Sequence, residues 1–477
     1  MSLKAKVLTG TKWVALANVF KQVMQVLSLI IFARLLSPDD FGIFSILMIF
    51  VSFLIMFVDM GTAAALIHVK KPTQKLLSSI FFFNIFIGIL LFLLLVLLSG
   101  NIAVFFEKPV LEELLKLIAI NFIIMSFGIV QKAKFEKEID LKNITLAESL
   151  AIFIGIAAGI ISAFYGLGVY SLIVQTLTTS FVTVALTWII SKWKPSLYFS
   201  FIEIQKIWKY TANLSTFNFV NYFSRNADNI LIGKFLDTHA LGVYSLAYSI
   251  MLYPLQNISR VLIRILFPAF SQIQDDNAKF KKAYIRSIFY IALISFPIMV
   301  GLMVTADLFV AVVFGDKWES LAILLIILAP VGMMNSIGGT NGIIYMAKGN
   351  TNLLLKVGIF STIVTIVFFI GGIFFGVEGV AISFLLSNII LFYPIFKISW
   401  GQIDLSLSEG LRPILPILAI SSFMGLSVWI VQQGMHSLSL HPIIELSIMI
   451  LSGVLIYSGL ISIKYGSIKT LTKELKK

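Results

Sequence analysis

The 477-residue chain contains no cysteine and few charged residues. Without cysteine it can form no disulfide, no thiolate nucleophile and no cysteine-ligated metal site. Asp, Glu, Lys and Arg together make up 12% of the residues, about half the fraction found in soluble proteins. Hydrophobic residues make up 59%, and the mean hydropathy is +0.99. This composition argues against a soluble globular protein and favours one that crosses the membrane many times.

Motifs for ATP hydrolysis and for metal catalysis are also missing. The chain has no phosphate-binding loop of the GxxxxGK[ST] type, so we expect that it does not hydrolyse ATP itself. None of its four histidines has the i, i+4 spacing of a helical metal pair. We therefore expect a protein that is not an enzyme, with no catalytic residue, no metal and no cofactor. A proton or a sodium ion is the expected coupling ion of any active transport.

Long apolar runs fill the chain instead. Residues 80–98 and 361–375 carry no charge at all, and a bilayer-spanning helix needs about 20 mostly apolar residues. The basic start leads into an apolar stretch too long for a signal-peptide core, which predicts a retained first helix. We predict an all-α polytopic membrane protein with about fourteen spans. They fall near 10–36, 41–68, 76–99, 112–131, 143–164, 167–191, 208–233, 240–267, 284–306, 320–347, 353–375, 377–398, 411–432 and 443–463.

The basic residues predict the orientation of these spans. With the N-terminus inside, 27 of the 36 Lys and Arg residues fall in inner segments or at the inner ends of spans, 5 fall in outer segments or at the outer ends of spans, and 4 lie deeper within spans. Cytoplasmic loops of membrane proteins carry such an excess of basic residues. The net charge of +13 is therefore better explained by membrane topology than by nucleic-acid binding. Both termini are predicted to be cytoplasmic.

A polar stripe runs along a helix that should be apolar, and it recurs 200 residues later. Spacings of 7, 3, 4 and 3 residues keep each stripe on one helical face. Ionisable groups at membrane depth are costly and usually face a bundle interior or a water-filled path. Two equivalent stripes predict a duplicated transporter whose halves face a shared polar cavity. The first stripe is Thr11, Asn18, Lys21, Gln25 and Ser28, and the second is Thr211, Asn218, Asn221, Arg225 and Asp228.

An alignment of residue n with residue n+200 supports the duplication. Across 11–50 it gives six identities, among them Gly42 with Gly242, and it places Arg34 on Lys234. Six spans separate the copies, so the repeats are parallel and related by an axis along the membrane normal. The predicted domains are a six-helix bundle over 1–200, a second over 201–400, and two further helices with a basic cytoplasmic tail over 401–477.

Lys21 and Arg225 are the main candidates for binding an anion in the cavity. A guanidinium is a planar donor that suits phosphate oxygens. The alternatives are an interfacial lysine at position 21 and a structural ion pair between Arg225 and Asp228. Asp228 is also a candidate for accepting a coupling proton or sodium ion. Neutral polar residues of the two stripes complete the predicted binding set: Asn18, Gln25, Asn218 and Asn221.

Three further charged residues lie within predicted spans. Arg260 and Arg264 either line the inner mouth of the cavity and attract an anionic head group, or extend to the inner lipid headgroups. Asp59 is a second candidate for ion coupling; otherwise it caps a broken segment or pairs with a lysine. The run NSIGGTNG at 335–342 weakens its helix. It predicts either close packing of small residues or a bend that opens a lateral gate.

Several segments together resemble a known family. FARLLSPDDFGIFSILMIF, GVYSLAYSIMLYPLQNIS, RILFPAFSQIQDDNAKFKKAYIRS and VVFGDKWESLAILLIILAP are similar to polysaccharide exporters of the Wzx type. These belong to the MOP superfamily, with MATE drug exporters and lipid II flippases. The resemblance implies two six-helix bundles around a V-shaped cavity, plus two C-terminal helices. It also implies cationic cavity residues that bind a pyrophosphate, for which Lys21 and Arg225 are the matching positions.

The hypothesis is a flippase that moves a polyprenyl-pyrophosphate-linked oligosaccharide from the inner to the outer leaflet of the bacterial cell (inner) membrane by alternating access. Its expected partners are this lipid, membrane lipid and other polysaccharide-assembly proteins, without nucleic acid. One alternative is a MATE-like cation exporter that depends on Asp59 or Asp228. Others are a polymerase or ligase, which would favour a long outer loop, and a scaffold for a biosynthetic complex.

Overall fold

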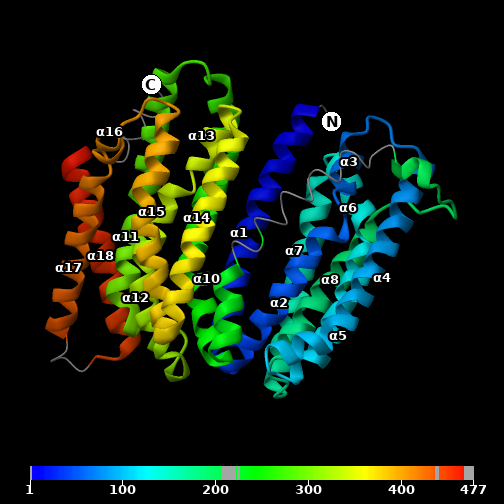
Figure 1. Ribbon diagram of the computed structural model, residues 1–477, viewed down its shortest axis with the longest axis horizontal. Helices are drawn as coiled ribbons and strands as arrows, with labels where there is room; N and C mark the ends of the chain where they lie inside the picture. Colours follow the sequence, from blue (N-terminus) through cyan, green and yellow to red (C-terminus); the bar gives the residue numbers. More distant parts are fainter. Residues whose placement is uncertain (1–2, 206–221, 223–225, 436–439, 467–477) are drawn as a thin grey trace. The chain divides into compact units, whose positions relative to one another are not determined.

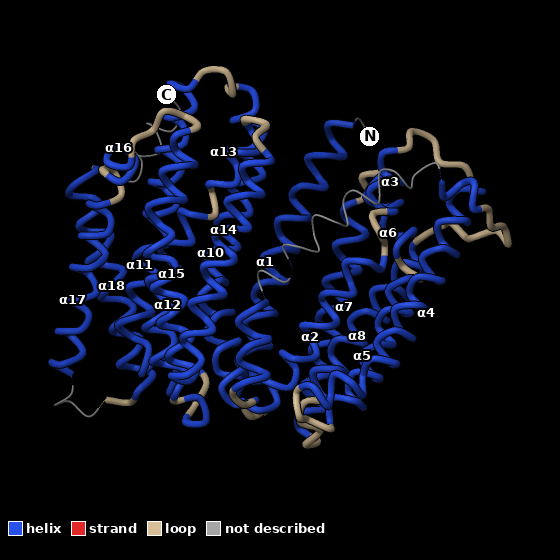
Figure 2. Tube along the Cα trace, in the orientation of Figure 1, coloured by secondary structure: helices blue, strands red, loops and turns tan. Residues whose placement is uncertain are grey.

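The computed structural model describes residues 3–205, 222, 226–435 and 440–466, without the side chains of 3–12 and 255–269. Regular structure in these ranges is helical throughout, with no strand (Figure 2). The all-α prediction is confirmed. The chain forms two compact units, Met1–Gly242 and Val243–Lys477. The domain limits at 200 and 400 stay predictions.

The first unit is built mainly from long helices that pack side by side (Figure 1). Helix α7 packs against both α8 and α1, and α4 packs against α5. Asp59 and Gly61 separate α2 from the short α3, and Phe127 and Gly128 separate α5 from α6. The helices are α1 (Leu3–Leu35), α2 (Pro38–Val58), α3 (Thr62–His68), α4 (Gln74–Phe105), α5 (Val110–Ser126), α6 (Ile129–Lys137), α7 (Leu141–Phe164) and α8 (Tyr170–Ile190).

In the second unit, α11 packs against α12, α17 and α18, while α15 packs against α12 and α14. Helix α10 begins in the last residues of the first unit and continues into the second. The elements are α10 (Thr238–Gln272), α11 (Asn277–Val313), η1 (Asp316–Trp318), α12 (Ser320–Gly338), α13 (Asn341–Ala347), α14 (Thr351–Gly372), η2 (Ile373–Phe375), α15 (Gly376–Gly401), α16 (Leu407–Leu411), α17 (Leu415–Met435) and α18 (Pro442–Tyr465).

Many of these helices can cross a bilayer. Within the described residues, 10 helical segments are long and apolar enough, or 11 if α5 and α6, bent by 43°, form one span. One of the ten, Thr351–Gly401, contains both α14 and α15. The chain is therefore a multi-pass membrane protein. The count of fourteen spans and the side of each terminus stay predictions.

The turn between α1 and α2 shows how the sequence starts a helix. The Ser37 side chain accepts a hydrogen bond from the Asp40 backbone N–H, and the Asp40 carboxylate accepts one from the Ser37 N–H. This capping box satisfies two N–H groups that a helix start leaves unpaired. Asp40 also accepts a hydrogen bond from the Val169 N–H at 3.0 Å. One carboxylate thus fixes α2 to the loop before α8.

The starts of α2 and α10 meet through two pairs of equivalent residues of the repeat, Pro38 with Thr238 and Gly42 with Gly242. A Cβ on Gly42 would overlap the carbonyl of Thr238, and a Cβ on Gly242 would overlap the carbonyl of Pro38. The Thr238 hydroxyl also donates a hydrogen bond to Asp39. All of these residues belong to the first unit. The 200-residue offset read from the sequence therefore matches a reciprocal contact in the structure.

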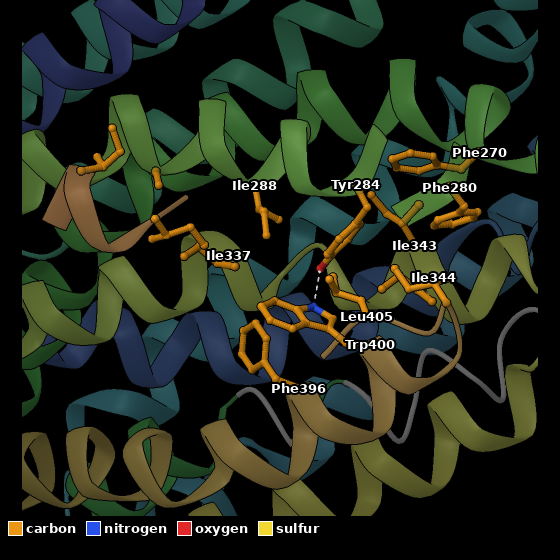
Figure 3. Packing of buried hydrophobic residues seen from close by; sticks show 14 of the residues in the cluster. Phe270, Phe280, Tyr284, Ile288, Ile337, Ile343, Ile344, Phe396, Trp400 and Leu405 are labelled. Carbon is orange, nitrogen blue, oxygen red and sulfur yellow. Dashed lines mark hydrogen bonds between the residues drawn. The ribbon is translucent and has the colours of Figure 1, made fainter. Parts of the chain in front are cut away.

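A buried polar network stands inside the core of the second unit (Figure 3). Tyr284 of α11 is fully buried, and its hydroxyl donates to the Asn341 side chain at 2.9 Å and lies 2.8 Å from the Thr340 hydroxyl. Trp400 of α15 donates to the Tyr284 hydroxyl at 3.2 Å. Thr340 and Asn341 lie where α12 ends and α13 begins. The run NSIGGTNG, predicted to weaken its helix, thus lies where α12 ends and α13 begins, and Tyr284 contacts it. Its role in a lateral gate stays a prediction.

Candidate functional site

Three charged side chains meet in the first unit, one each from α1, α6 and α7. Lys21 Nζ lies 2.5 Å from Glu148 Oε2, and Lys132 Nζ lies 2.8 Å from Glu148 Oε1. Helix α7 packs against both α1 and α6, which brings the three residues together (Figure 1). Each lysine takes one oxygen of the same carboxylate. We call these three residues the Lys21–Glu148–Lys132 cluster.

The cluster has two positive charges and one negative charge, so it retains a net positive charge. The side chains of Lys21 and Glu148 are 17% and 23% exposed, whereas that of Lys132 is 50% exposed. A charge at membrane depth is costly unless it is paired. Glu148 supplies that pairing for Lys21, and the more exposed Lys132 carries the excess charge. An anion that displaces a Glu148 oxygen from Lys21 would bind close to both lysine ammonium groups.

The polar stripe on α1 lies beside this cluster. Asn18 and Gln25 are exposed, one turn to either side of the partly buried Lys21. Ser28, further along, is buried and accepts a hydrogen bond from Gln175 at 3.4 Å. The stripe is thus open around Lys21 and packed against α8 at its other end. Whether its open part binds an anion stays a prediction.

Glu148 was not among the residues predicted from the sequence. It lies within the predicted span 143–164, in the run LAESLAIFIGIAAG. An ionisable residue within a span is by itself a functional candidate, so the signal was present. Its partners could not be read from the sequence, because Lys21 is 127 positions away.

The second stripe is only partly described. Asn218, Asn221 and Arg225 lie outside the described residues, so the predicted pair between Arg225 and Asp228 stays a prediction. Asp228 is 4% exposed, and its carboxylate accepts a hydrogen bond from the Asn229 N–H at 2.8 Å.

The remaining charged candidates are on α10 and after α2. Arg260 and Arg264 are on α10, in the part whose side chains are not described. Asp59 directly follows α2, and its carboxylate accepts a hydrogen bond from the Gly61 N–H at 3.0 Å. Asp59 therefore caps the break between α2 and α3, which is one of its predicted roles. Its role in ion coupling stays a prediction. The described residues hold no group of three or more His, Asp or Glu placed to bind a metal.

An apolar groove of about 670 Å³ adjoins the Lys21–Glu148–Lys132 cluster. Its walls are formed by α1 and α7. They include Phe20, the sequence neighbour of Lys21, and Ser149, the sequence neighbour of Glu148. Such a groove accommodates a hydrocarbon chain without loss of hydrogen bonds. A charged cluster and an apolar groove between the same two helices form an amphipathic site. The groove is lined by Trp13, Leu16, Ala17, Phe20, Leu146, Ser149, Leu150 and Phe153.

The family model described as polysaccharide biosynthesis protein matches residues 31–323. The chain belongs to this family. The family resemblance found in the sequence is confirmed. The chain is 28% identical to the lipopolysaccharide biosynthesis protein WzxC of Escherichia coli (strain K12), over 89% of each chain. It is 26% identical to the teichuronic acid biosynthesis protein TuaB of Bacillus subtilis (strain 168), over 100% of this chain and 99% of the other.

The fold has a solved counterpart in the lipid II flippase MurJ in its inward closed conformation. The TM-score is 0.74 with 18% sequence identity, and the match covers 97% of this chain and 99% of that one. At this identity the likeness establishes the fold alone. The chain therefore shares the fold of this solved structure, and it is a multi-pass protein of the bacterial cell membrane.

Proposed function

We propose that this protein is a flippase that carries a polyprenyl-pyrophosphate-linked oligosaccharide from the inner to the outer leaflet. The observation that carries the proposal is the apolar groove between α1 and α7, next to the Lys21–Glu148–Lys132 cluster. A lipid pyrophosphate has an anionic head on a hydrocarbon tail, and the site offers a matching pair of surfaces. The names of WzxC and TuaB, which refer to lipopolysaccharide and teichuronic acid biosynthesis, support polysaccharide assembly as the setting.

In the proposed mechanism, Glu148 is the resident counter-ion of Lys21. The pyrophosphate replaces one carboxylate oxygen at Lys21, while Lys132 keeps hold of the other. Lys21 is then neutralised in both the empty and the loaded protein, so it is never an unpaired charge in the membrane. The oligosaccharide travels through a wet path while the prenyl tail stays in apolar surroundings. Alternating access of the two repeats moves the head group across.

We also propose that transport is coupled to a proton or sodium gradient, with Asp228 and Asp59 as candidate carriers. The position of Asp228 supports its candidacy, because it is buried within a predicted span and ionisable residues there mark ion pathways. Other polysaccharide-assembly proteins are proposed partners. Flipping in proteoliposomes with an imposed pH gradient or sodium gradient tests the coupling. Equal rates with and without both gradients would exclude it.

The proposed function is tested with a fluorescent polyprenyl-pyrophosphate-linked oligosaccharide in proteoliposomes, read by quenching of the outer leaflet. Lys21→Ala should slow flipping about tenfold or more, since a hydrogen bond to a charged group contributes about 1.5–3 kcal/mol. Arg225→Ala tests the second stripe in the same way. Lys116→Ala is the matched control, because Lys116 is a half-exposed lysine paired with Glu112 one helical turn away.

Two results would decide against the proposal. A wild-type protein that flips no such lipid would contradict the function. Normal flipping by both Lys21→Ala and Arg225→Ala would leave the function standing and contradict the site.

A further inference from the structure

A second cavity, of about 230 Å³, lies within the second unit between α12, α14 and α15. Four of its lining residues carry uncharged polar side chains: Asn335, Ser361, Thr365 and Asn388. None of them belongs to the polar stripes, and no charged residue lines the cavity. It is therefore a hydrogen-bonding site of a different kind from the Lys21–Glu148–Lys132 cluster.

The polar residues of this cavity lie at mid-membrane depth. Ser361 is near the middle of α14 (Thr351–Gly372), and Asn388 is near the middle of α15 (Gly376–Gly401). Asn335 is near the middle of the candidate span Ser320–Ala347. Polar groups at this depth are costly against lipid and usually face a wet path. Transporters place their substrate sites near the bilayer midplane.

The side chains leave hydrogen-bonding capacity for a ligand. The Ser361 hydroxyl donates to the Gly358 carbonyl at 2.9 Å, which leaves its oxygen free to accept. The Asn388 amide donates one hydrogen to the Phe384 carbonyl at 2.8 Å, which leaves its second N–H and its oxygen. Among the residues the structure describes, the side chains of Asn335 and Thr365 make no hydrogen bond. The cavity thus offers donors and acceptors together, as a ring of hydroxyl groups requires.

Aromatic rings form part of the apolar lining, beside Met334, Leu391 and Ile395. Phe392 and Phe396 stack with their centroids 4.2 Å apart, and Phe396 meets the ring of Trp400 edge-on at 4.9 Å. Figure 3 shows Phe396 and Trp400 side by side in the buried core. The wall is therefore held by the core and does not depend on a ligand. A sugar ring has hydroxyl groups at its edge and C–H groups on its faces, which match amides beside an aromatic wall.

We propose that this cavity binds a neutral sugar residue of the transported oligosaccharide, an inference that rests on the proposed flippase function. The absence of any lysine or arginine in the lining argues against the pyrophosphate as the occupant. The absence of a carboxylate argues against a cation, and the volume is several times the ~30 Å³ that a water molecule occupies. An uncharged, hydroxyl-rich ring fits the size and the chemistry together. The site recognises the sugar, and the lysine cluster holds the charge.

The cysteine-free chain allows a direct test in proteoliposomes. In the full-length protein, Ser361→Cys and Thr365→Cys should react with a hydrophilic methanethiosulfonate reagent. Val367→Cys is the matched control on the same helix, because Val367 is 62% exposed and is absent from the cavity lining. It should not react if it faces lipid. Each variant is first checked by thermal unfolding and size-exclusion chromatography in detergent, which shows that it folds.

Protection of the cysteine from labelling by a bound lipid then identifies the occupant of the cavity. The probe is the neutral-hexose-bearing polyprenyl pyrophosphate that the wild type flips, compared with the same lipid pyrophosphate without sugar. At about ten times its Kd, the sugar-bearing lipid should slow labelling of Ser361→Cys about tenfold, because the free fraction of sites falls as 1/(1 + [L]/Kd). The sugar-free lipid should leave the rate unchanged.

The outcomes separate this inference from the proposed function. If wild-type protein flips the lipid but neither cysteine is labelled, or both lipids protect equally, the sugar site is wrong and the flippase function stands. Protection by sodium ions alone would assign the cavity to a cation and also contradict the sugar site. If the wild type flips no lipid-linked sugar, the function fails and this inference fails with it.

Discussion

Glu148 is the residue that joins the two lysines of the candidate site, and its charge is testable by itself. Glu148→Gln keeps the shape but leaves Lys21 and Lys132 facing a neutral amide. Breaking a fully buried pair costs about 3–5 kcal/mol; with these side chains partly exposed, we expect a loss of about 1–3 kcal/mol. Thermal unfolding in detergent measures it.

The matched control for that variant is Glu112→Gln, since Glu112 pairs with Lys116 at the surface, with both side chains nearly half exposed. Exposed pairs of this kind contribute about 0.3–0.5 kcal/mol. If Glu148→Gln loses no more stability than the control, Glu148 is not the counter-ion of a costly intramembrane charge. If it also binds polyprenyl pyrophosphate more weakly than the wild type, Glu148 is not the group that the substrate displaces.

In the second unit the Tyr284 hydroxyl contacts the side chains of three residues, Thr340, Asn341 and Trp400. Tyr284→Phe removes the acceptor of the buried Trp400 N–H and the donor to Asn341. A buried polar group left unsatisfied costs about 1–3 kcal/mol, so we expect destabilisation of that order in denaturant unfolding. Tyr393→Phe is the control, because Tyr393 is exposed and its hydroxyl accepts from the exposed Lys397. Equal losses in the two variants would contradict a structural role for the buried network.

Glu409, outside the spans, gives a prediction for pH. A hydrogen bond from Lys281, together with bonds from Ser406, lowers the pKa of Glu409 to about 2. This value is below that of the unfolded chain, about 4.3, so the ionised group stabilises the fold. The contribution is complete above the unfolded pKa and disappears as the pH falls from there through about 2. The difference in unfolding midpoint between wild type and Glu409→Gln should therefore be constant from pH 7 to about 5 and then shrink.

Lys281→Ala provides the check on this pH effect. It removes the largest cause of the lowered pKa of Glu409. In the Lys281→Ala protein, the substitution Glu409→Gln should change the unfolding midpoint at neutral pH much less than it does in the wild type. If the difference in unfolding midpoint between wild type and Glu409→Gln stays the same down to pH 3, the Glu409 carboxyl does not titrate in this way.

At the scale of elements, the contact between the starts of α2 and α10 predicts a matched pair of effects. Gly42→Ala and Gly242→Ala each place a Cβ onto a backbone carbonyl of the other helix, which cannot move as a flexible side chain can. Both should destabilise the protein by about 1–3 kcal/mol, the usual cost of overpacking. Gly459→Ala, inside α18 with open space around it, should be neutral or stabilising. A destabilising effect at only one of the two positions would contradict the reciprocal contact.

The sequence was informative about features that depend on local order and on periodicity. The 200-residue repeat, the weakened helix at NSIGGTNG and the cap at Asp59 each depend on residues close in the chain or on a fixed offset. The end of the predicted span 112–131 was less accurate, because α5 stops at Ser126 and a second helix, α6, continues to Lys137. Pairing across helices, such as Lys21 with Glu148, depends on which faces pack together, and apolar faces rich in Leu, Ile and Phe do not specify that choice.

At the scale of the whole molecule, the excess of inner Lys and Arg predicts the side of every loop. Single cysteines in the cysteine-free chain test it with a membrane-impermeant maleimide. Leu167→Cys and Lys317→Cys should be labelled in intact spheroplasts, because Leu167 is at the outer end of the predicted span 167–191, Lys317 lies in a predicted outer segment, and both are exposed. Lys71→Cys, exposed in a predicted inner segment, should be labelled only after permeabilisation.

The pair at 167 and 317 also tests the number of spans. Four predicted spans separate these positions, including 208–233, most of which lies outside the described residues. An even number of crossings places both cysteines on the same side of the membrane, whereas an odd number would place them on opposite sides. Labelling of Leu167→Cys without Lys317→Cys would therefore remove one span from the prediction. If the lost span lies before position 234, the result would also contradict the parallel repeat, because two copies that start on opposite sides of the membrane are related by an axis in its plane.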